Sequence, residues 1–433
     1  MEIVDEMYWE PEIETMPAPR LRDIQEERFL RLVDYVYTNT NFYKRKFDEA
    51  GLSPGDITSL EDLSKLPLTR YLEDFAATSI EDKLAVDWDD VTEIMTTSGT
   101  ISGTTLPVMM TEKDVDQGFN LFARVARMTG MRPDDIVQML MPWDVSVPTM
   151  KKLASKVLPG MAGRMILDEQ IKLAVAVKST VIFGMPSYIL MFVNRAKDLG
   201  IDIRKDTSLR LALMGGEPLS ASVRERLRYE TGIDFHDMYG FAEVMGIGGE
   251  CSMKQNLHIW ADHYILEVID INTSAPLGPG EMGELVITTL TKEAMPLVRY
   301  KTGDVTMILD NGECQCGRTH PRIAPVKGRV FHMIKVDGRI IFPIDIDNFI
   351  TKDTRLSNEF RIIVDNPGIL DLLKLKVEYK PGVANLSGLK QELEDALMSE
   401  ISLKNEIELL PEGALAKTQF KAQRIVKTYQ QDQ

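Results

Sequence analysis

The chain has 433 residues, of which 44% are hydrophobic and 27% are charged, so it is long enough for two or three globular units and is neither disordered nor fibrous. Its 50 Lys and Arg residues against 66 Asp and Glu give a formal net charge of -16, which argues against a nucleic-acid partner. The acidic N-terminus lacks the basic start and apolar run of a signal peptide, and the longest nearly apolar stretch, 181–193, is too short to cross a bilayer. With only three cysteines, the sequence predicts a cytoplasmic protein that has no membrane partner and no disulfide framework.

The first two-thirds of the chain predict an α/β domain. Apolar residues between 21 and 36 recur near helical spacing, and 91–96 has the pattern of a short strand. We expect a loop to join this strand to a helix that starts at the capping-box-like pair Thr111 and Asp114. Buried strands of a parallel sheet then alternate with helical stretches, at 135–142, 179–186 and 209–218. Beyond them, two strand patterns separated by a turn rich in Pro and Gly predict an antiparallel hairpin at 263–290.

A second domain is predicted from Gly328 onward. Two alternating strand patterns, 360–365 and 373–380, precede a helix that carries Leu389 and Leu393 on one face. We therefore expect an α/β protein with mixed sheets in a large N-terminal domain, 1–327, and a small mobile α+β C-terminal domain, 328–433.

The stretch TTSGTISGTTLP, 96–107, is rich in hydroxyl side chains and has two glycines. Glycines let backbone N–H groups turn toward an anion, and hydroxyl groups add donors without formal charge, which would suit a polyphosphate. The stretch is not a Walker loop, because no Gly-Lys-Ser/Thr follows at the required distance. Taken alone, it could equally be a Ser/Thr-rich surface turn.

Five further motifs occur in an order and spacing that one family shares. They are MPSY at 185–188, GGEP at 215–218, DMYGFAEVMG at 237–246, LTKEAMPLVRYKTGD at 290–304 and Gly-Arg at 328–329. From about Arg28 to Lys427 the chain resembles the phenylacetate-coenzyme A ligase group of the acyl-adenylate-forming enzymes. The resemblance implies an AMP-forming acid–thiol ligase whose partners are small molecules: an aromatic carboxylate, ATP and coenzyme A. It also allows a homodimer.

The resemblance assigns the nucleotide and its Mg²⁺ to particular residues. The β- and γ-phosphates would be held by Thr97, Ser98, Gly99 and Thr100. Tyr239 would lie against adenine, Asp304 would take both ribose hydroxyls and Glu243 would bind Mg²⁺, tasks that suit an aromatic face and carboxylate oxygens. Further nucleotide contacts are implied for Gly215, Gly216, Glu217, Pro218, Asp237, Met238, Gly240 and Arg329.

Lys421, in QFKAQRIVK, matches the family's catalytic lysine, with Phe420 where the family has glycine. A positioned ammonium there would stabilise the charge that builds up as pyrophosphate leaves. The chain also departs from the family pattern, with Thr104 in place of the loop lysine and with Phe331 and His332 where acids usually follow Gly-Arg at the hinge. Two alternatives therefore stay open: a nucleotidyltransferase that adenylates a cofactor or other acceptor without coenzyme A, and a non-catalytic nucleotide-binding relative.

The three cysteines fall in two segments that also carry histidines. Cys251 and His258 are seven residues apart, and Cys314 and Cys316 lie in ECQCGRTH. Three sulfurs and one nitrogen could form a closed structural Zn²⁺ site, with His320 as the competing fourth ligand, and buried free thiols are the alternative.

For the acyl group, an apolar pocket could be formed by Trp143, Phe183, Tyr188 and the glycine-rich stretch at Gly246, although ordinary core packing explains these residues as well.

Overall fold

The computed structural model describes residues 7–97, 105–140, 151–153, 156–160, 166–309, 314–415 and 424–430. The chain divides into two compact units. The first contains Met1–Gly184, Thr207–Gly216 and Asp234–Val326, and the second contains Met185–Asp206, Glu217–Ile233 and Lys327–Gln433. The boundary that we expect between 327 and 328 stays a prediction.

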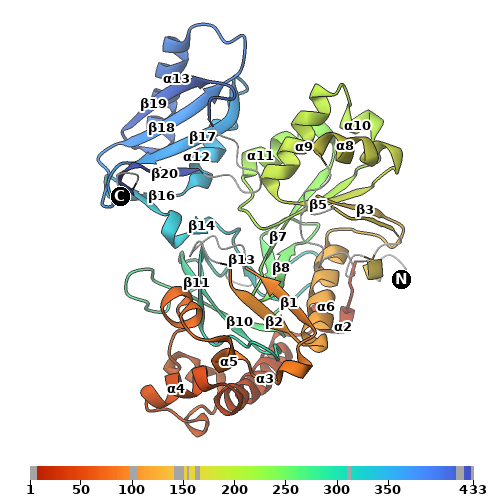
Figure 1. Ribbon diagram of the computed structural model, residues 1–433, viewed down its shortest axis with the longest axis vertical. Coiled ribbons are helices and arrows are strands. Elements are labelled where there is room, and N and C mark those ends of the chain that lie inside the picture. The colour runs from red at the N-terminus through yellow and green to blue at the C-terminus, as the bar shows by residue number, and fades with distance from the viewer. Residues whose placement is uncertain are drawn as a thin grey trace. The chain divides into compact units, whose positions relative to one another are not determined.

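Helices dominate the start of the first unit. α3 (Ala18–Asn39) buries Leu21, Phe29 and Val36 on one face, as the helical spacing predicts. The helices α4 and α5 lie near the same end of the unit as α3 (Figure 1). The other helices of this part are α2 (Pro11–Glu14), α4 (Asn41–Glu49), α5 (Ile80–Lys83), the 3-10 helices Pro54–Asp56, Leu60–Lys65 and Trp88–Asp90, and a π-helix, Tyr71–Ala76.

The strand 91–96 begins a hairpin that the sequence pattern alone did not reveal. β1 (Glu93–Thr96) pairs antiparallel with β2 (Pro107–Met110), and only then does α6 (Glu112–Met128) begin. The expectation that the hydroxyl-rich loop leads directly into the helix is therefore wrong, because the buried apolar run at 108–110 continues as a paired strand. The predicted capping box is confirmed: Asp114 N–H donates to Thr111 Oγ1 at 3.1 Å, and Thr111 N–H donates to Asp114 Oδ2 at 3.2 Å.

An eight-stranded mixed sheet forms the centre of the first unit, in the order β13-β9-β8-β7-β6-β5-β3-β4. Five strands are parallel: β4 (Lys156–Leu158), β3 (Ile136–Met139), β5 (Val181–Gly184), β6 (Leu211–Met214) and β7 (Asp234–Phe241). Of these, β3, β5 and β6 are the strands that the sequence predicts. The antiparallel strands are β8 (Met245–Glu250), β9 (Leu257–Ile259) and β13 (Arg322–Ile323). α8 (Leu167–Ala176) packs on the sheet, where Gln138 Nε2 on β3 donates to the carbonyl of Gln170 at 2.7 Å.

Three further strands of the first unit pair antiparallel, and the motif at 290–304 begins directly after the second of them and ends within the third. β10 (Tyr264–Ile269) pairs with β11 (Gly283–Thr289), and β11 pairs with β12 (Tyr300–Thr306). This arrangement confirms the predicted hairpin at 263–290.

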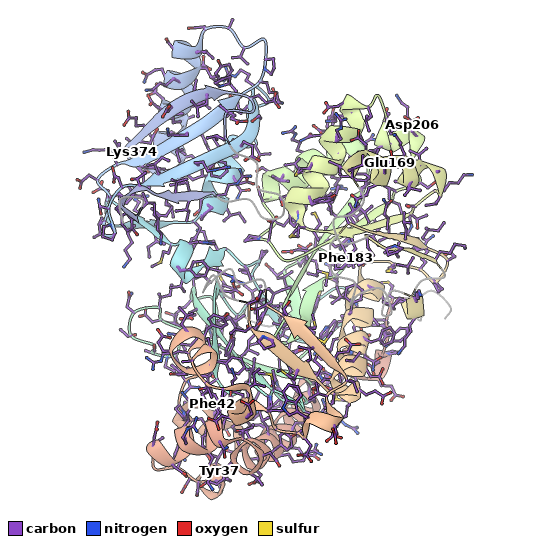
Figure 2. The ribbon with its side chains drawn as sticks, viewed as in Figure 1. Tyr37, Phe42, Glu169, Phe183, Asp206 and Lys374 are labelled. Carbon is purple, nitrogen blue, oxygen red and sulfur yellow. The ribbon has the colours of Figure 1, made fainter. Side chains whose placement is uncertain are left out.

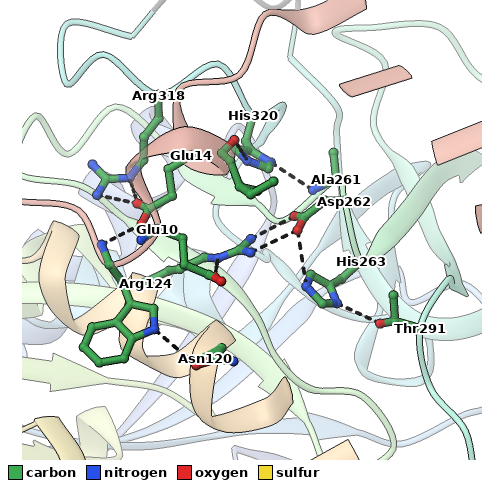
Figure 3. A network of polar contacts seen from close by, with 12 residues as sticks. Glu10, Glu14, Asn120, Arg124, Ala261, Asp262, His263, Thr291, Arg318 and His320 are labelled. Carbon is green, nitrogen blue, oxygen red and sulfur yellow. Dashed lines mark hydrogen bonds and ion pairs between the residues drawn. The ribbon is translucent and has the colours of Figure 1, made fainter. Parts of the chain in front are cut away.

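A buried ionic network ties the N-terminal segment to α6 and to the loop after Cys316 (Figure 3). Arg124 contacts Asp262 at 2.8 Å and Glu10 at 2.6 Å, and Arg318 contacts Glu14 at 2.7 Å. Because the side chains of Arg318 and Glu14 are both fully buried, each charge depends on its partner for the solvation that water would otherwise provide.

The second unit combines three helices, α9 (Pro186–Asp198), α10 (Ile203–Asp206) and α11 (Ala221–Thr231), with the C-terminal segment. A four-stranded sheet of order β19-β18-β17-β20 and the helix α13 enclose its core, which includes Phe360 and Leu397. The elements are β14 (Gly328–Arg329), the 3-10 helix Val330–His332, β15 (Ile334–Val336), β16 (Arg339–Ile341), α12 (Pro343–Ile350), β17 (Leu356–Val364), β18 (Leu373–Tyr379), α13 (Leu386–Ile401), β19 (Asn405–Pro411), β20 (Ile425–Lys427) and the 3-10 helix Thr428–Gln430.

Within the described part of the chain, no helix is both long enough and apolar enough to cross a membrane.

Candidate functional site

Thr97 closes the base of the hydroxyl-rich loop. Its N–H donates to the carbonyl of Leu106 at 2.9 Å, and its Oγ1 accepts from the N–H of Leu106, also at 2.9 Å. Thr97 is buried, so these two bonds fix where the loop leaves β1 and where it returns. Ser98, Gly99, Thr100 and Thr104 lie outside the described residues, as do Trp143 and Lys421.

Tyr239 and Asp304, which the sequence assigns to adenine and ribose, are in direct contact. The Tyr239 hydroxyl donates to Asp304 Oδ2 at 2.6 Å, and both residues are buried. Tyr239 lies on β7, and Asp304 lies on β12 directly after Gly303, whose φ of +74° suits glycine. The fold thus joins two predicted nucleotide residues that are 65 positions apart.

The tight hairpin between β7 and β8 carries Glu243, the predicted Mg²⁺ ligand. Glu243 is buried, and its Oε1 accepts from the Tyr300 hydroxyl at 3.2 Å. Its backbone carbonyl accepts from the ammonium of Lys292. β7 and β8 lie close together here, since a Cβ on Gly240 would lie 2.0 Å from the carbonyl oxygen of Met245. Glu243 is therefore held through both its side chain and its main chain.

Two residues that contact this turn were not found from the sequence as site residues. Tyr300 packs with Phe75 and Phe241, at ring separations of 5.6 and 6.2 Å, and burial raises its pKa well above the ordinary value. Burial also lowers the pKa of Lys292, although the negative charges of Asp114 and Glu243 act to raise it. Both lie within the predicted motif LTKEAMPLVRYKTGD, but nothing in local spacing shows that they contact a turn some 50 residues earlier.

The remaining motif residues of the first unit cluster around β6 and β7. Gly215 follows β6, and a Cβ there would lie 2.9 Å from Met238 Cγ, so a larger residue would have to displace Met238. The N–H of Asp237 donates to the buried carboxylate of Glu250 at 2.8 Å, which anchors β7 to β8. Gly216 has a φ of +82°, a conformation that favours glycine.

In the second unit, the predicted residues occupy two separate elements. Glu217 and Pro218 precede α11, and the Glu217 carboxylate accepts from the N–H of Ser187 in the MPSY motif at 3.1 Å. Arg329 lies on β14, with its guanidinium 5.9 Å from the ring centre of Phe331. Phe331 and His332, the substituted hinge residues, form a short 3-10 helix with Val330.

The structure brings the predicted cysteine–histidine set together. The ligand atoms of Cys251, His258, Cys314 and Cys316 lie within 4.8 Å of one another, and all four residues are buried. His320 is not part of the set, because its Nδ1 accepts from Ala261 N–H at 3.0 Å and its Nε2 lies 3.1 Å from the carbonyl of Ile13 (Figure 3). Between the two candidate histidines, the fold thus selects His258.

A small pocket of about 30 Å³ lies beside the Glu243 turn. Apolar side chains form part of its wall, including Leu121, Val244 and Met245, and Lys292 lies at its polar side. Of the residues that we expected around the acyl group, the three that the structure describes, Phe183, Tyr188 and Gly246, do not line this pocket. Phe183, on β5, is instead buried against the ring of Phe122 at 5.5 Å, and Figure 2 marks its position.

The sequence and fold agree with one family. Residues 19–291 match the family of AMP-binding enzymes, and residues 338–428 match the AMP-binding enzyme C-terminal domain. The chain belongs to the AMP-binding enzyme family, as expected from its motifs.

Two relatives with named activities indicate the class of enzyme within this family. The chain is 34% identical over 383 residues to a phenylacetate-coenzyme A ligase of Thermus thermophilus, covering 86% of this chain and 84% of that protein. A phenylacetate-coenzyme A ligase of Escherichia coli is 33% identical over 378 residues, with 85% and 84% covered.

A solved structure confirms the predicted fold class. The 2-hydroxyisobutyryl-CoA ligase in the postadenylation state, in complex with 2-HIB-AMP, superposes with a TM-score of 0.88 at 25% identity. The match covers 98% of this chain and 93% of that chain, so the α/β architecture with a large N-terminal and a C-terminal domain is the fold of acyl-CoA ligases.

Proposed function

We propose that the protein is an ATP-dependent ligase that activates an aromatic carboxylic acid as an acyl-adenylate and transfers the acyl group to coenzyme A, releasing AMP and pyrophosphate. The contact between Tyr239 and Asp304 carries this proposal, because it places an aromatic face and a carboxylate together where a nucleoside needs both. Full-length relatives that are named phenylacetate-coenzyme A ligases support the aromatic substrate class.

In the first half-reaction, a carboxylate oxygen attacks the α-phosphorus of ATP and the bond to pyrophosphate breaks. Thr97 anchors the loop that we assign to the β- and γ-phosphates. Asp304 offers two acceptor oxygens to the ribose hydroxyls, and Tyr239 presents its ring to adenine. Glu243 would supply an oxygen ligand to Mg²⁺, which when bound would neutralise phosphate charge.

In the second half-reaction, the coenzyme A sulfur attacks the acyl carbon, the bond between that carbon and the phosphate oxygen breaks, and AMP leaves with this oxygen.

Two residues of the C-terminal segment complete the proposed site. We assign the catalytic ammonium to Lys421, which would stabilise negative charge on the α-phosphate during the first half-reaction. Arg329 is a further proposed nucleotide contact. Rotation of the C-terminal domain at the hinge would separate the two steps, and Phe331 and His332 would tune this hinge.

The cysteine cluster fits a structural Zn²⁺. In a tetrahedral site with Zn–S of ~2.3 Å and Zn–N of ~2.1 Å, two sulfurs lie ~3.8 Å apart and a sulfur and a nitrogen ~3.6 Å apart. The observed separations are 3.7 Å between Cys251 Sγ and Cys314 Sγ, and 3.4 Å between Cys316 Sγ and His258 Nε2. Four protein ligands leave no open coordination position, so we propose a structural and not a catalytic role.

The aromatic acid itself, a homodimeric state and a cytoplasmic location stay predictions. For the acyl group, Trp143, Phe183, Tyr188 and Gly246 remain the proposed contacts.

The decisive experiment measures AMP and pyrophosphate released from Mg-ATP with a panel of aromatic acids, including phenylacetate and benzoates, with and without coenzyme A. We expect one acid to give AMP and a new thioester in equal amounts, and only when coenzyme A is present. Pyrophosphate release that continues over many turnovers with no requirement for coenzyme A would instead identify a nucleotidyltransferase. An absence of ATP turnover with every acid would overturn the ligase proposal.

A further inference from the structure

The segment from Leu290 to Ala294 is fixed from two sides. Leu290 N–H donates to the carbonyl of His263 at 2.8 Å, and Thr291 Oγ1 lies 2.7 Å from His263 Nδ1 (Figure 3). On the other side, the Asp114 carboxylate accepts from Glu293 N–H at 2.7 Å and from Ala294 N–H at 2.9 Å. The backbone on both sides of Lys292 is therefore held, which limits the directions that its side chain can take.

Asp114 makes these contacts while it also caps α6. The same carboxylate that receives the two N–H groups of the 293–294 backbone closes the capping box with Thr111. One buried side chain thus joins the start of α6, the helix that follows β2, to the segment that carries Lys292. A shift of either element would break charge-assisted hydrogen bonds in the other.

Lys292 connects this segment to the Glu243 turn. Its ammonium donates to the backbone carbonyl of Glu243, while the Tyr300 hydroxyl donates to the carboxylate of the same residue. The turn is narrow, and Met245 at its end has a left-handed φ of +64°, a conformation that a non-glycine residue adopts at a cost. A strained turn keeps its geometry only when its surroundings fix it, and Lys292 contacts its centre.

We propose that Lys292 is a positioning residue that holds the Glu243 turn so that the carboxylate is oriented for Mg²⁺-bound ATP. The proposal rests on the proposed function, because it assumes that Glu243 is the metal ligand. Lys292 acts through Glu243 and does not itself need to touch the nucleotide.

The test measures ATP binding by calorimetry on the full chain, in EDTA and at stepped MgCl₂ concentrations, so that no acid substrate is needed. Lys292→Met removes the ammonium and keeps the chain length, Lys292→Arg keeps a cationic donor, and Lys292→Gln serves if the methionine variant does not fold. Lys113→Met is the matched control, because exposed Lys113 pairs with the carboxylate of neighbouring Glu293 at 2.5 Å. Glu243→Gln tests the metal assignment separately.

We expect Lys292→Met to reduce the gain in ATP affinity that Mg²⁺ provides by about tenfold, the effect of one charge-assisted hydrogen bond. Binding in EDTA should change much less, Lys292→Arg should recover most of the gain, and Lys113→Met should match the parent protein. A folded Lys292→Met or Lys292→Gln variant with the parent Mg²⁺ dependence, alongside a Glu243→Gln variant that has lost it, overturns the role of Lys292 alone. If Glu243→Gln keeps the parent Mg²⁺ dependence, the metal assignment fails and the role of Lys292 fails with it.

Discussion

The buried pair of Glu14 and Arg318 offers a sharp test of how the N-terminal segment is held. Arg318 Nε donates to Glu14 Oε2 at 2.7 Å, and the other carboxylate oxygen accepts from the N–H groups of Trp9 at 2.7 Å and Glu10 at 2.8 Å (Figure 3). Glu14→Gln keeps the shape of the side chain but leaves the guanidinium facing a neutral amide, fully out of water.

Removing one partner of a buried ion pair costs about 3 to 5 kcal/mol, because the remaining charge has neither water nor a counterion. For a folding unit of this size, about 2 °C in melting temperature corresponds to each kcal/mol, so we expect Glu14→Gln to lower the melting temperature by about 6 to 10 °C. The control is Glu61→Gln, which breaks an ion pair with Arg22 whose side chains are 66% and 60% exposed. Such surface pairs contribute about 0 to 1 kcal/mol.

Thermal unfolding followed by circular dichroism gives the melting temperatures, and hydrogen exchange of residues 7–16 reports whether the N-terminal segment loosens. We expect faster exchange in Glu14→Gln and parent-like exchange in Glu61→Gln. Melting temperatures of the two variants within 2 °C of each other would refute the argument that burial makes the Glu14 pair strong.

Three further outcomes follow from other parts of the molecule. Burial lowers the pKa of His263 from 6.5 to about 4, so the unfolded chain binds the extra proton between these values. The free energy of unfolding is therefore unaffected by this histidine above pH 6.5 and falls by about 3 kcal/mol as the pH falls to 4. We expect His263→Gln to make the free energy of unfolding, measured by urea titration, less dependent on pH in this range. Gly118→Ala places a Cβ 2.2 Å from Met245 Sδ, so this side chain must move, and we expect severalfold weaker ATP binding by calorimetry in spite of the higher helix propensity of alanine. Elemental analysis should find about one zinc per chain, and Cys316→Ser should abolish it and lower the melting temperature, whereas an unchanged metal content and stability would exclude the site.

Local patterns in the sequence were enough to predict those helices and strands that depend on residues close together in the chain. The alternation of buried strands and helices predicted the parallel strands β3, β5 and β6, because burial on both faces leaves a continuous apolar run. The capping box at Thr111 was equally readable, since both of its partners lie within four residues. The strand β2 was missed because Pro107 and three following apolar residues do not alternate, and only pairing with β1 distinguishes them from a loop.

The sequence by itself determined the family, the α/β class and the residue types that a nucleotide site requires, because ordered motifs and periodicities are properties of the chain alone. Only the tertiary structure decided that His258 and not His320 joins the cysteines, that Tyr239 contacts Asp304, and that Lys292 reaches the Glu243 turn. The contacts of His258 with Cys316, of Tyr239 with Asp304 and of Lys292 with Glu243 each span about 50 or more residues, and spacing along the chain does not fix which sheet edges and loops meet. They depend on the order in which the strands pair, which is set by the burial of the whole core.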